Sequence, residues 1–182
     1  MRLRLIKAGR QLFAKDGYEK ASTPHIVKLA GVTRGALYHH FKDKKALFRA
    51  VVEAESTQVA EDIRDADASN ARDALFAGSD AFFNAMAIEG RVRILLVEGP
   101  RVLGVETMAS IDAATGANQL KEGLQYAKDQ NILDPNADVA QMAMLLSAGF
   151  DRAALAIADG QSKSKVRDAI NFLIERMLDD DT

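Results

Sequence analysis

The sequence predicts an all-α protein of about nine helices, because helix breakers are few and apolar residues recur at helical spacing. Only three prolines and twelve glycines interrupt the 182 residues. Apolar side chains recur three or four positions apart, as they do along one face of a helix. Runs of β-branched residues, which are typical of strands, are scarce.

The N-terminal part predicts four helices, over 3–16, 24–30, 34–41 and 44–68. Gly17 is expected to end the first of them, since glycine is common just after a helix. Thr23, Thr33 and Asp43 each precede one of the others, and their side-chain oxygens can cap the free N–H groups of a first turn. Pro24 suits the first position of the second helix.

Beyond residue 70 the apolar spacing predicts five more helices, over 71–87, 91–97, 103–129, 135–158 and 162–179. The run from Glu98 to Pro100 is expected to end the second of these, because proline disrupts a helix interior. Asp134 and Pro135 are expected to begin the fourth. No internal repeat and no low-complexity segment interrupts this series.

Charge divides the chain into a basic beginning and an acidic remainder. Residues 1–50 hold twelve Lys and Arg against three Asp and Glu, a net charge of +9, whereas residues 51–182 carry a net charge of −11. A basic segment favours a polyanionic partner, and an acidic one repels it. We therefore expect two domains, over 1–48 and 49–182, that meet inside the helix at 44–68. The alternative is that surface charges are unevenly spread by chance.

Residues 23–42 have the pattern of a helix-turn-helix, in which two short helices cross steeply at a tight turn. Ile26, Leu37 and Phe41 are expected to face inward and hold the crossing together. Gly31 suits the turn, since glycine adopts a positive φ at no steric cost. The exposed beginning of the second helix is the end that enters the major groove of DNA in such motifs.

Eight residues are candidates for DNA contact: Thr23, Thr33, Arg34, Gly35, Ala36, Tyr38, His39 and Lys44. Arg34 is the candidate base reader, because its planar guanidinium can donate to O6 and N7 of a guanine. Gly35 and Ala36 are small enough for the backbone to approach the bases. The other five are expected to bind phosphate through polar tips, free N–H groups at helix N-termini or an ammonium group.

Three stretches of this segment resemble the DNA-binding domain of tetracycline-repressor-like (TetR family) regulators: Phe13-Ala-x-x-Gly17-Tyr18, Thr23-x-x-Ile26 and Ala30-Gly31-Val32-Thr33-x-Gly35-Ala36-Leu37-Tyr38-x-His40-Phe41-Lys42-Asp43-Lys44-x-x-Leu47. The resemblance covers about residues 3–50. It implies a nine-helix, all-α architecture with a small effector bound in the C-terminal domain. Val27 departs from the pattern, which usually has alanine there. The chain also begins almost directly with its first helix, so minor-groove contacts from a basic arm are not expected.

A single helix-turn-helix reads little DNA, so we expect a homodimer on a palindromic operator in double-stranded DNA. Apolar stripes on the last two helices are candidates for the dimer interface. The first stripe consists of Val139, Met142, Leu146, Phe150, Ala153 and Ile157, and the second of Val166, Ile170, Leu173, Ile174 and Met177. The two helices of each protomer would form half of a four-helix interface. The alternative is that both stripes face the protomer's own core.

Apolar residues of the C-terminal part are candidates for the lining of an effector pocket: Phe76, Phe82, Phe83, Met86, Met108, Ile111, Tyr126 and Phe150. Asn118 and Gln119 would add polar contacts. The alternative for each apolar residue is ordinary core. The leading hypothesis is a repressor that a small effector releases from DNA. Control by a protein partner is a second hypothesis, and a helical ligand-binding or structural protein with an incidentally basic end is a third.

Other classes of function lack their residues in this sequence. The absence of cysteine excludes a cysteine nucleophile and any cysteine-based zinc site. Neighbouring helix positions such as His39 and His40 point about 100° apart, and with His25 as the third histidine no metal site is expected. No phosphate-binding loop or nucleophile elbow occurs, so we expect neither an enzyme nor a cofactor. No apolar run suits a membrane span and no signal peptide is evident, which favours the cytoplasm.

Overall fold

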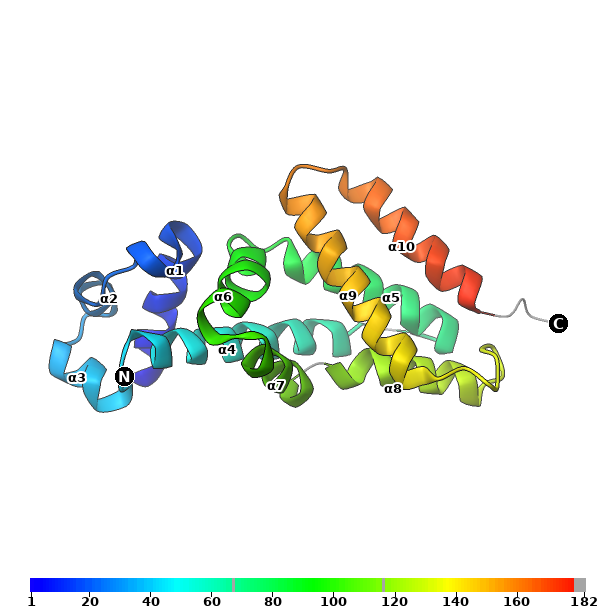
Figure 1. Ribbon diagram of the computed structural model, residues 1–182, viewed down its shortest axis with the longest axis horizontal. Coiled ribbons are helices and arrows are strands. Elements are labelled where there is room, and N and C mark those ends of the chain that lie inside the picture. Colours follow the sequence, from blue (N-terminus) through cyan, green and yellow to red (C-terminus); the bar gives the residue numbers. More distant parts are fainter. Residues whose placement is uncertain (67, 116, 179–182) are drawn as a thin grey trace. The chain divides into compact units, whose positions relative to one another are not determined.

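The computed structural model describes residues 1–66, 68–115 and 117–178, except for the side chains at 115, 117 and 118 (Figure 1). Within this part the protein is α-helical without a strand, which confirms the predicted fold class. The helices are α1 (Arg2–Lys20), α2 (Thr23–Ala30), α3 (Arg34–His40), α4 (Lys44–Arg64), α5 (Ala71–Met86), α6 (Gly99–Leu103), α7 (Val105–Thr115), α8 (Ala117–Asp129), α9 (Val139–Ala158) and α10 (Lys163–Met177), with a π-helical segment η1 (Arg93–Glu98) before α6.

The chain forms two compact units. The first unit consists of Met1–Thr57 and Ile88–Asp112, and the second of the described part of Gln58–Ala87 and Ala113–Thr182. Helices α4 and α7 each supply residues to both units. The expected division into a DNA-binding domain over 1–48 and a second domain over 49–182 is a division by function. The two compact units do not test it, and it stays a prediction.

Helices α3 and α4 begin where the sequence predicts. The Oγ1 of Thr33 accepts a hydrogen bond from the N–H of Ala36 at 3.2 Å, and Oδ1 of Asp43 accepts one from the N–H of Ala46 at 2.7 Å. Each bond satisfies one of the N–H groups that a first helical turn leaves without a partner.

The predicted cap of α2 is wrong by one residue. Ser22, rather than Thr23, accepts the hydrogen bond, through its Oγ from the N–H of His25 at 3.4 Å. Thr23 is therefore the first helical residue. Pro24 follows it within the first turn, where a missing N–H is tolerated.

Residues 91–103 form one continuous series of helical turns, so the predicted end between Glu98 and Pro100 is wrong. The N–H of Gly99 donates to the carbonyl of Ile94, five residues back, which defines the wide turn of η1. Pro100 is tolerated because it lies in the first turn of α6, directly after this change of register. Space at residue 99 is tight, since a Cβ there would lie 2.9 Å from Sδ of Met108 and 3.0 Å from the carbonyl oxygen of Ile94.

Two later boundaries also differ from the predictions. The helix expected over 103–129 is two helices, and Gly104, with a φ of 91°, separates the first of them from α6. Gly116, which is part of the range predicted for that helix, lies outside the described residues. Helix α9 begins at Val139 rather than at 135, because Oδ1 of Asp138 caps it.

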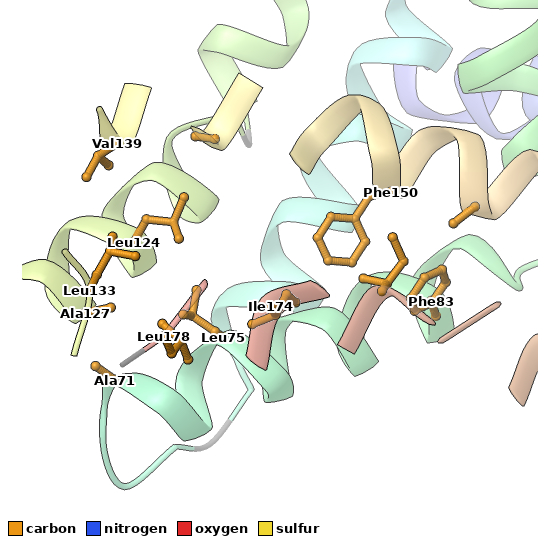
Figure 2. Packing of buried hydrophobic residues seen from close by; sticks show 13 residues of the cluster. Ala71, Leu75, Phe83, Leu124, Ala127, Leu133, Val139, Phe150, Ile174 and Leu178 are labelled. Atoms are coloured by element: carbon orange, nitrogen blue, oxygen red, sulfur yellow. The ribbon is translucent and has the colours of Figure 1, made fainter. Parts of the chain in front are cut away.

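The second unit has an apolar core between α5, α8, α9 and α10 (Figure 2). Its buried members include Leu75 and Phe83 on α5, Leu124 on α8, Phe150 on α9 and Ile174 on α10. Residues three or four positions apart on each helix supply these side chains, as the apolar spacing predicts. Full burial of such a side chain stabilises a fold by about 1.5–3 kcal/mol.

The stripe predicted for dimer contact on α9 belongs to this core, so that prediction is wrong. Val139, Phe150 and Ala153 are buried in the core, and Met142, Leu146 and Ile157 pack against it. Most of the stripe on α10 also belongs to this core. Ile170 and Ile174 are buried in it, and Val166 and Met177 pack against it. Only Leu173 of this stripe is exposed. Apolar spacing identifies a face that needs cover, and in this protein the protomer covers both faces itself.

In the first unit, α1 packs on α4 through aromatic rings. The ring centroids of Phe13 and Phe48 are 5.0 Å apart, and Tyr18 lies 5.1 Å from Phe48 and 5.9 Å from Phe13. Gly9 faces α4, since a Cβ there would lie 3.4 Å from Cγ2 of Val51 and 3.5 Å from Cδ2 of Leu47. Edge-to-face ring contacts of this kind add to the free energy of burial.

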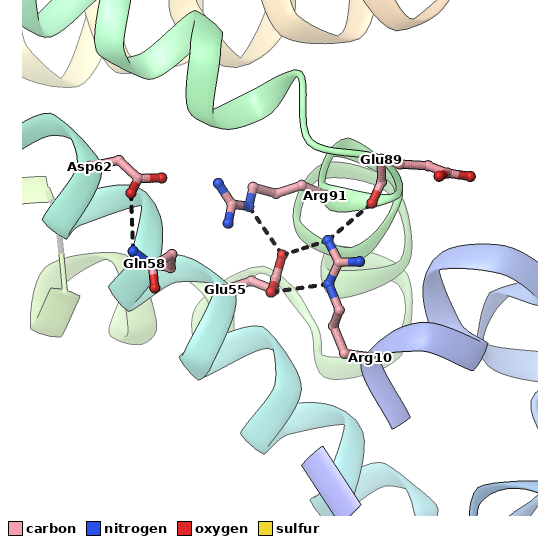
Figure 3. A network of polar contacts seen from close by, with 6 residues as sticks. All are labelled: Arg10, Glu55, Gln58, Asp62, Glu89 and Arg91. Atoms are coloured by element: carbon pink, nitrogen blue, oxygen red, sulfur yellow. Dashed lines mark hydrogen bonds and ion pairs between the residues drawn. The ribbon is translucent and has the colours of Figure 1, made fainter. Parts of the chain in front are cut away.

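Charged side chains also join α1 and α4, together with residues 88–91 (Figure 3). The carboxylate of Glu55 accepts hydrogen bonds from Arg10 at 3.3 Å and from Arg91 at 3.1 Å. Arg10 also donates to the backbone carbonyl of Glu89 at 3.0 Å. The side chains of Glu55 and Arg91 are only 12% and 4% exposed, so this charge pair is shielded from water.

We expect Glu55→Gln to lower the free energy of unfolding by about 3 kcal/mol, because glutamine supplies no charge to the buried guanidinium of Arg91. Urea unfolding at neutral pH would measure the change. Glu53→Gln is the matched control on the same helix: Glu53 pairs with Arg49 at 2.8 Å, both side chains are exposed, and such pairs contribute at most about 1 kcal/mol. Equal losses in the two variants would contradict the prediction.

Candidate nucleic-acid interface

The turn between α2 and α3 depends on Gly31, which ends α2 in the left-handed conformation with a φ of 61° and a ψ of 43°. Its N–H donates to the carbonyl of Lys28, and the N–H of Val32 donates to that of Val27. The carbonyl of Gly31 accepts a hydrogen bond from Nη2 of Arg4 on α1 at 3.1 Å. A residue with a Cβ would be strained at this φ and would also meet that guanidinium.

The inward-facing residues of the motif are as the sequence predicts. Ile26, Leu37 and Phe41 are buried, together with Ala30. His40, the last residue of α3, is exposed, and Phe41 occupies the buried position that follows it.

The beginning and one face of α3 are exposed to solvent. Thr33, Arg34, Gly35 and His39 are exposed, and Tyr38 is 42% exposed. The guanidinium of Arg34 lies 5.5 Å from the ring centroid of Tyr38, one helical turn away, so the two side chains share a face. This face therefore presents a planar cation and a phenol beside small residues.

The other three candidates for DNA contact are only partly exposed. Ala36, in the first turn of α3, and Thr23, in the first turn of α2, are partly buried. Lys44 begins α4, and its Nζ donates to the carbonyls of Tyr18 at 2.9 Å and Glu19 at 3.4 Å.

The ammonium of Lys44 is also held by an aromatic ring. It lies 4.3 Å from the ring centroid of Tyr18, a cation–π contact. Burial, followed by the charges of Asp43 and Glu19, raises the pKa of the Tyr18 phenol, which keeps this ring neutral. An ammonium has three N–H donors, so the two carbonyls leave one for another ligand.

Sequence reasoning passed over two exposed cations beside Lys44. Lys42 and Lys45 flank it, and both are exposed. The signal was present in the run Lys42-Asp43-Lys44-Lys45, in which Asp43 caps α4. Of the three ammonium groups, only that of Lys44 bonds to the backbone and lies over the ring of Tyr18. This choice depends on Tyr18, which is distant in sequence.

The structure brings together only part of the predicted effector-pocket lining. Phe83 and Phe150 are buried in the core of the second unit, and Phe76 and Phe82 are partly buried against it. The ring centroid of Phe82 lies 5.5 Å from that of Phe83 and 5.1 Å from that of Phe150. Phe82, Phe83 and Phe150 therefore form an aromatic cluster within the second unit, and Phe76 packs elsewhere against the same core.

The other four candidates lie apart from this cluster or at its edge. Met108 and Ile111 are buried in the first unit, Met86 is buried at the end of α5, and Tyr126 is exposed on α8. Of the predicted polar contacts, Gln119 donates to the carbonyl of Ala60, and the side chain of Asn118 lies outside the described residues.

The described part of the chain has neither a cluster of metal ligands nor a membrane-spanning helix. No group of three or more His, Asp or Glu side chains in it is arranged to hold a metal ion. None of its helices combines the length and the apolar character that crossing a membrane requires.

Solved structures share this fold over nearly the whole chain. A TetR-family transcriptional regulator from Pectobacterium atrosepticum superposes with a TM-score of 0.80 at 25% identity, covering 97% of this chain and 93% of that one. The fatty acid degradation regulator FadR from Bacillus halodurans has a TM-score of 0.81 at 18% identity, covering 95% of this chain and 93% of its own. The second likeness shows the fold alone.

Sequence comparison gives the family. The HTH-type transcriptional repressor AcnR of Corynebacterium diphtheriae is 37% identical over 60 residues, which is 33% of this chain and 32% of AcnR, so the match spans about a third of that relative. Residues 5–51 match the family of bacterial regulatory proteins, tetR family, and residues 72–180 match the tetracyclin repressor-like C-terminal domain. The second match covers more than half of the sequence, and the chain belongs to the TetR family.

Proposed function

We propose that the protein is a sequence-specific DNA-binding transcriptional repressor. The observation that carries the proposal is the exposed beginning of α3, where Arg34 and Tyr38 share one face beside Gly35. The name of the relative AcnR supports repression, and the net charge of +9 over residues 1–50 supports a polyanionic partner. Because bacterial DNA lies in the cytoplasm, the protein acts there, and its function requires no catalysis.

We assign base reading and phosphate binding to different side chains. Arg34 reads a guanine from the major groove, and Gly35 and Ala36 let the backbone of α3 approach the bases. The remaining candidates bind phosphate: Thr23 and Thr33 at helix N-termini, Tyr38 and His39 beside the groove, and Lys44 through its third donor. Lys42 and Lys45 add exposed charge to this set.

We propose that the protein acts as a homodimer through the outward faces of α9 and α10. Met144 and Leu145 on α9 and Phe172 and Leu173 on α10 are each more than half exposed. Large apolar side chains gathered on one surface mark an interaction site, and two copies would cover each other's. The dimer places two copies of α3 about 34 Å apart, one turn of DNA, on a palindromic operator.

We further propose that a small apolar effector releases the repressor from its operator. Its site is the aromatic cluster of the second unit, where Phe82 remains partly exposed beside Phe83 and Phe150 and where Phe76 packs against the same core. An effector acts only by its different affinity for two conformations, so it must bind better to one in which α4 misplaces the DNA-binding helices. Control by a protein partner instead of a small molecule is the alternative.

Binding to a palindromic fragment from upstream of its own gene tests the DNA proposal. We expect Arg34→Ala to cost about 1–3 kcal/mol of binding free energy and to relax specificity at one base pair. Lys42→Ala should weaken binding to all sequences alike and reduce the salt dependence by about one phosphate contact. Fluorescence anisotropy with single-base variants of the fragment would measure both. A wild-type protein that does not distinguish the fragment from random DNA would overturn the proposal.

The dimer proposal predicts that Leu145→Glu combined with Phe172→Glu gives a protomer of about 19.8 kDa, because two buried carboxylates would oppose association. Sedimentation equilibrium at several concentrations would measure the mass. Val105→Glu is the control, since Val105 is an exposed apolar residue of α7 in the first unit and should leave the mass unchanged. A double variant that remains dimeric would contradict this interface.

A thermal-shift screen of small aromatic and aliphatic metabolites tests the effector proposal. We expect a binding compound to raise the unfolding temperature by several degrees at concentrations well above its dissociation constant and to weaken operator binding. Phe82→Ala should reduce its affinity, whereas Ile88→Ala, at an exposed apolar residue of the first unit, should not. A partner protein that releases the operator while no compound does would favour the alternative.

A further inference from the structure

The helical course of α1 is broken near its end at Gly17, where φ is 79° and ψ is 168°. This conformation is open almost only to glycine. Backbone groups on both sides of the break lose their partners within the helix, so other groups must satisfy them. After this junction the chain turns directly into α2.

Two charged side chains from η1 hold the junction. The Nη1 of Arg93 donates to the carbonyls of Ala14 and Lys15 at 3.1 and 2.8 Å, before the break. The Oε1 of Glu98 accepts a hydrogen bond from the N–H of Tyr18 at 3.3 Å, directly after it. Lys44 completes the set from α4 at the next carbonyls, those of Tyr18 and Glu19.

Glu98 approaches the backbone closely because residue 17 has no side chain. A Cβ at Gly17 would lie 2.8 Å from Oε1 of Glu98. The carboxylate is held from its other side by Arg101, whose Nη2 lies 2.7 Å from Oε2. Its side chain is 12% exposed, so little water competes for the N–H of Tyr18.

The wide turn of η1 explains how Arg93 and Glu98 both reach α1. Residues five positions apart on an α-helix point about 140° away from each other. The hydrogen bond from Gly99 to Ile94 spans five residues, and this wider turn brings positions 93 and 98 closer to one face. The π-helical turn therefore allows Arg93 and Glu98 to contact α1 together.

We propose that Arg93 and Glu98 are positioning residues for DNA binding. They lie outside residues 5–51, the part that matches the DNA-binding family. By holding the end of α1 they set where α2 begins, and with it the place of α3. The proposal rests on the proposed function, because it assigns η1 a part in the affinity of α3 for DNA.

Glu98→Ala in the full-length chain distinguishes a positioning role from a purely electrostatic one, because the two predict opposite changes in affinity for DNA. Removal of a negative charge should by itself strengthen binding to DNA. Loss of the bond to Tyr18 should weaken it, and we expect about tenfold weaker binding to the operator fragment. Glu98→Gln removes the same charge but keeps an oxygen acceptor, so it should bind at least as tightly as the wild type.

Matched variants and a second readout complete the test. Arg93→Ala should weaken operator binding by a similar factor, and Arg93→Lys should restore it, since lysine can also donate to both carbonyls. Glu106→Ala, at an exposed carboxylate of α7, is the control and should not weaken binding. Hydrogen exchange should become faster around Tyr18 in Glu98→Ala and remain unchanged across α5, α9 and α10.

Each result decides one question. Glu98→Ala that binds operator as tightly as the wild type overturns the proposal, and so does Glu98→Gln that loses as much affinity as Glu98→Ala. Unchanged exchange around Tyr18 also overturns it, and this measurement requires no DNA. If the wild type does not bind the operator fragment at all, the proposed function fails, while the exchange measurement still decides whether Glu98 holds the junction.

Discussion

Helices α2 and α3 depend on α1, because they are too short to be stable by themselves. Helix α2 has eight residues and α3 has seven, whereas an isolated helix in water needs about 12–15 to be even marginally stable. Their order comes from buried side chains such as Ile26 and Leu37, and from the packing of α1 on α4. An exposed side chain of α3, such as Arg34, is therefore only as well placed as α1, on which α3 depends.

Much of what fixes α1 is polar, and this affects how precisely it is placed. Apolar contacts between Phe13 and Phe48 favour burial but tolerate small rotations. Hydrogen bonds from Arg10 to Glu55 and from Lys44 to the carbonyl of Tyr18 are directional, so they select one register among those the apolar contacts permit. A shielded pair such as Glu55 and Arg91 does not by itself make a fold more stable, but its disruption is costly.

Sequence reasoning succeeded where the determining contacts are local. The cap at Thr33, the turn at Gly31 and the inward residue Leu37 each depend on neighbours a few positions away, so the motif could be predicted in detail. The bonds of Lys44 to Tyr18 and of Glu98 to the same residue join positions 26 and 80 apart in sequence. No local pattern encodes such pairs.

The π-helical turn escaped prediction for a similar reason. Pro100 after Gly99 is a standard signal for the end of a helix, and the sequence gives no sign that a wider turn would carry the helix past it. Met108, whose Sδ would lie 2.9 Å from a Cβ at residue 99, packs close to this turn, but it belongs to another helix. Tertiary packing therefore overrode the local signal.

Helix α9 illustrates why apolar spacing alone could not locate the dimer face. Its mean hydropathy is high because it is apolar on two sides: one side, with Val139 and Phe150, lies in the core, and the other carries Met144 and Leu145. The regular spacing of the first side favours a dimer interface, but a protomer must first cover its own core. A helix that is apolar all round is normally buried all round. In this protomer only one side of α9 is covered, and the exposed apolar residues of the second side, rather than the regular stripe of the first, are the basis of the proposed dimer interface.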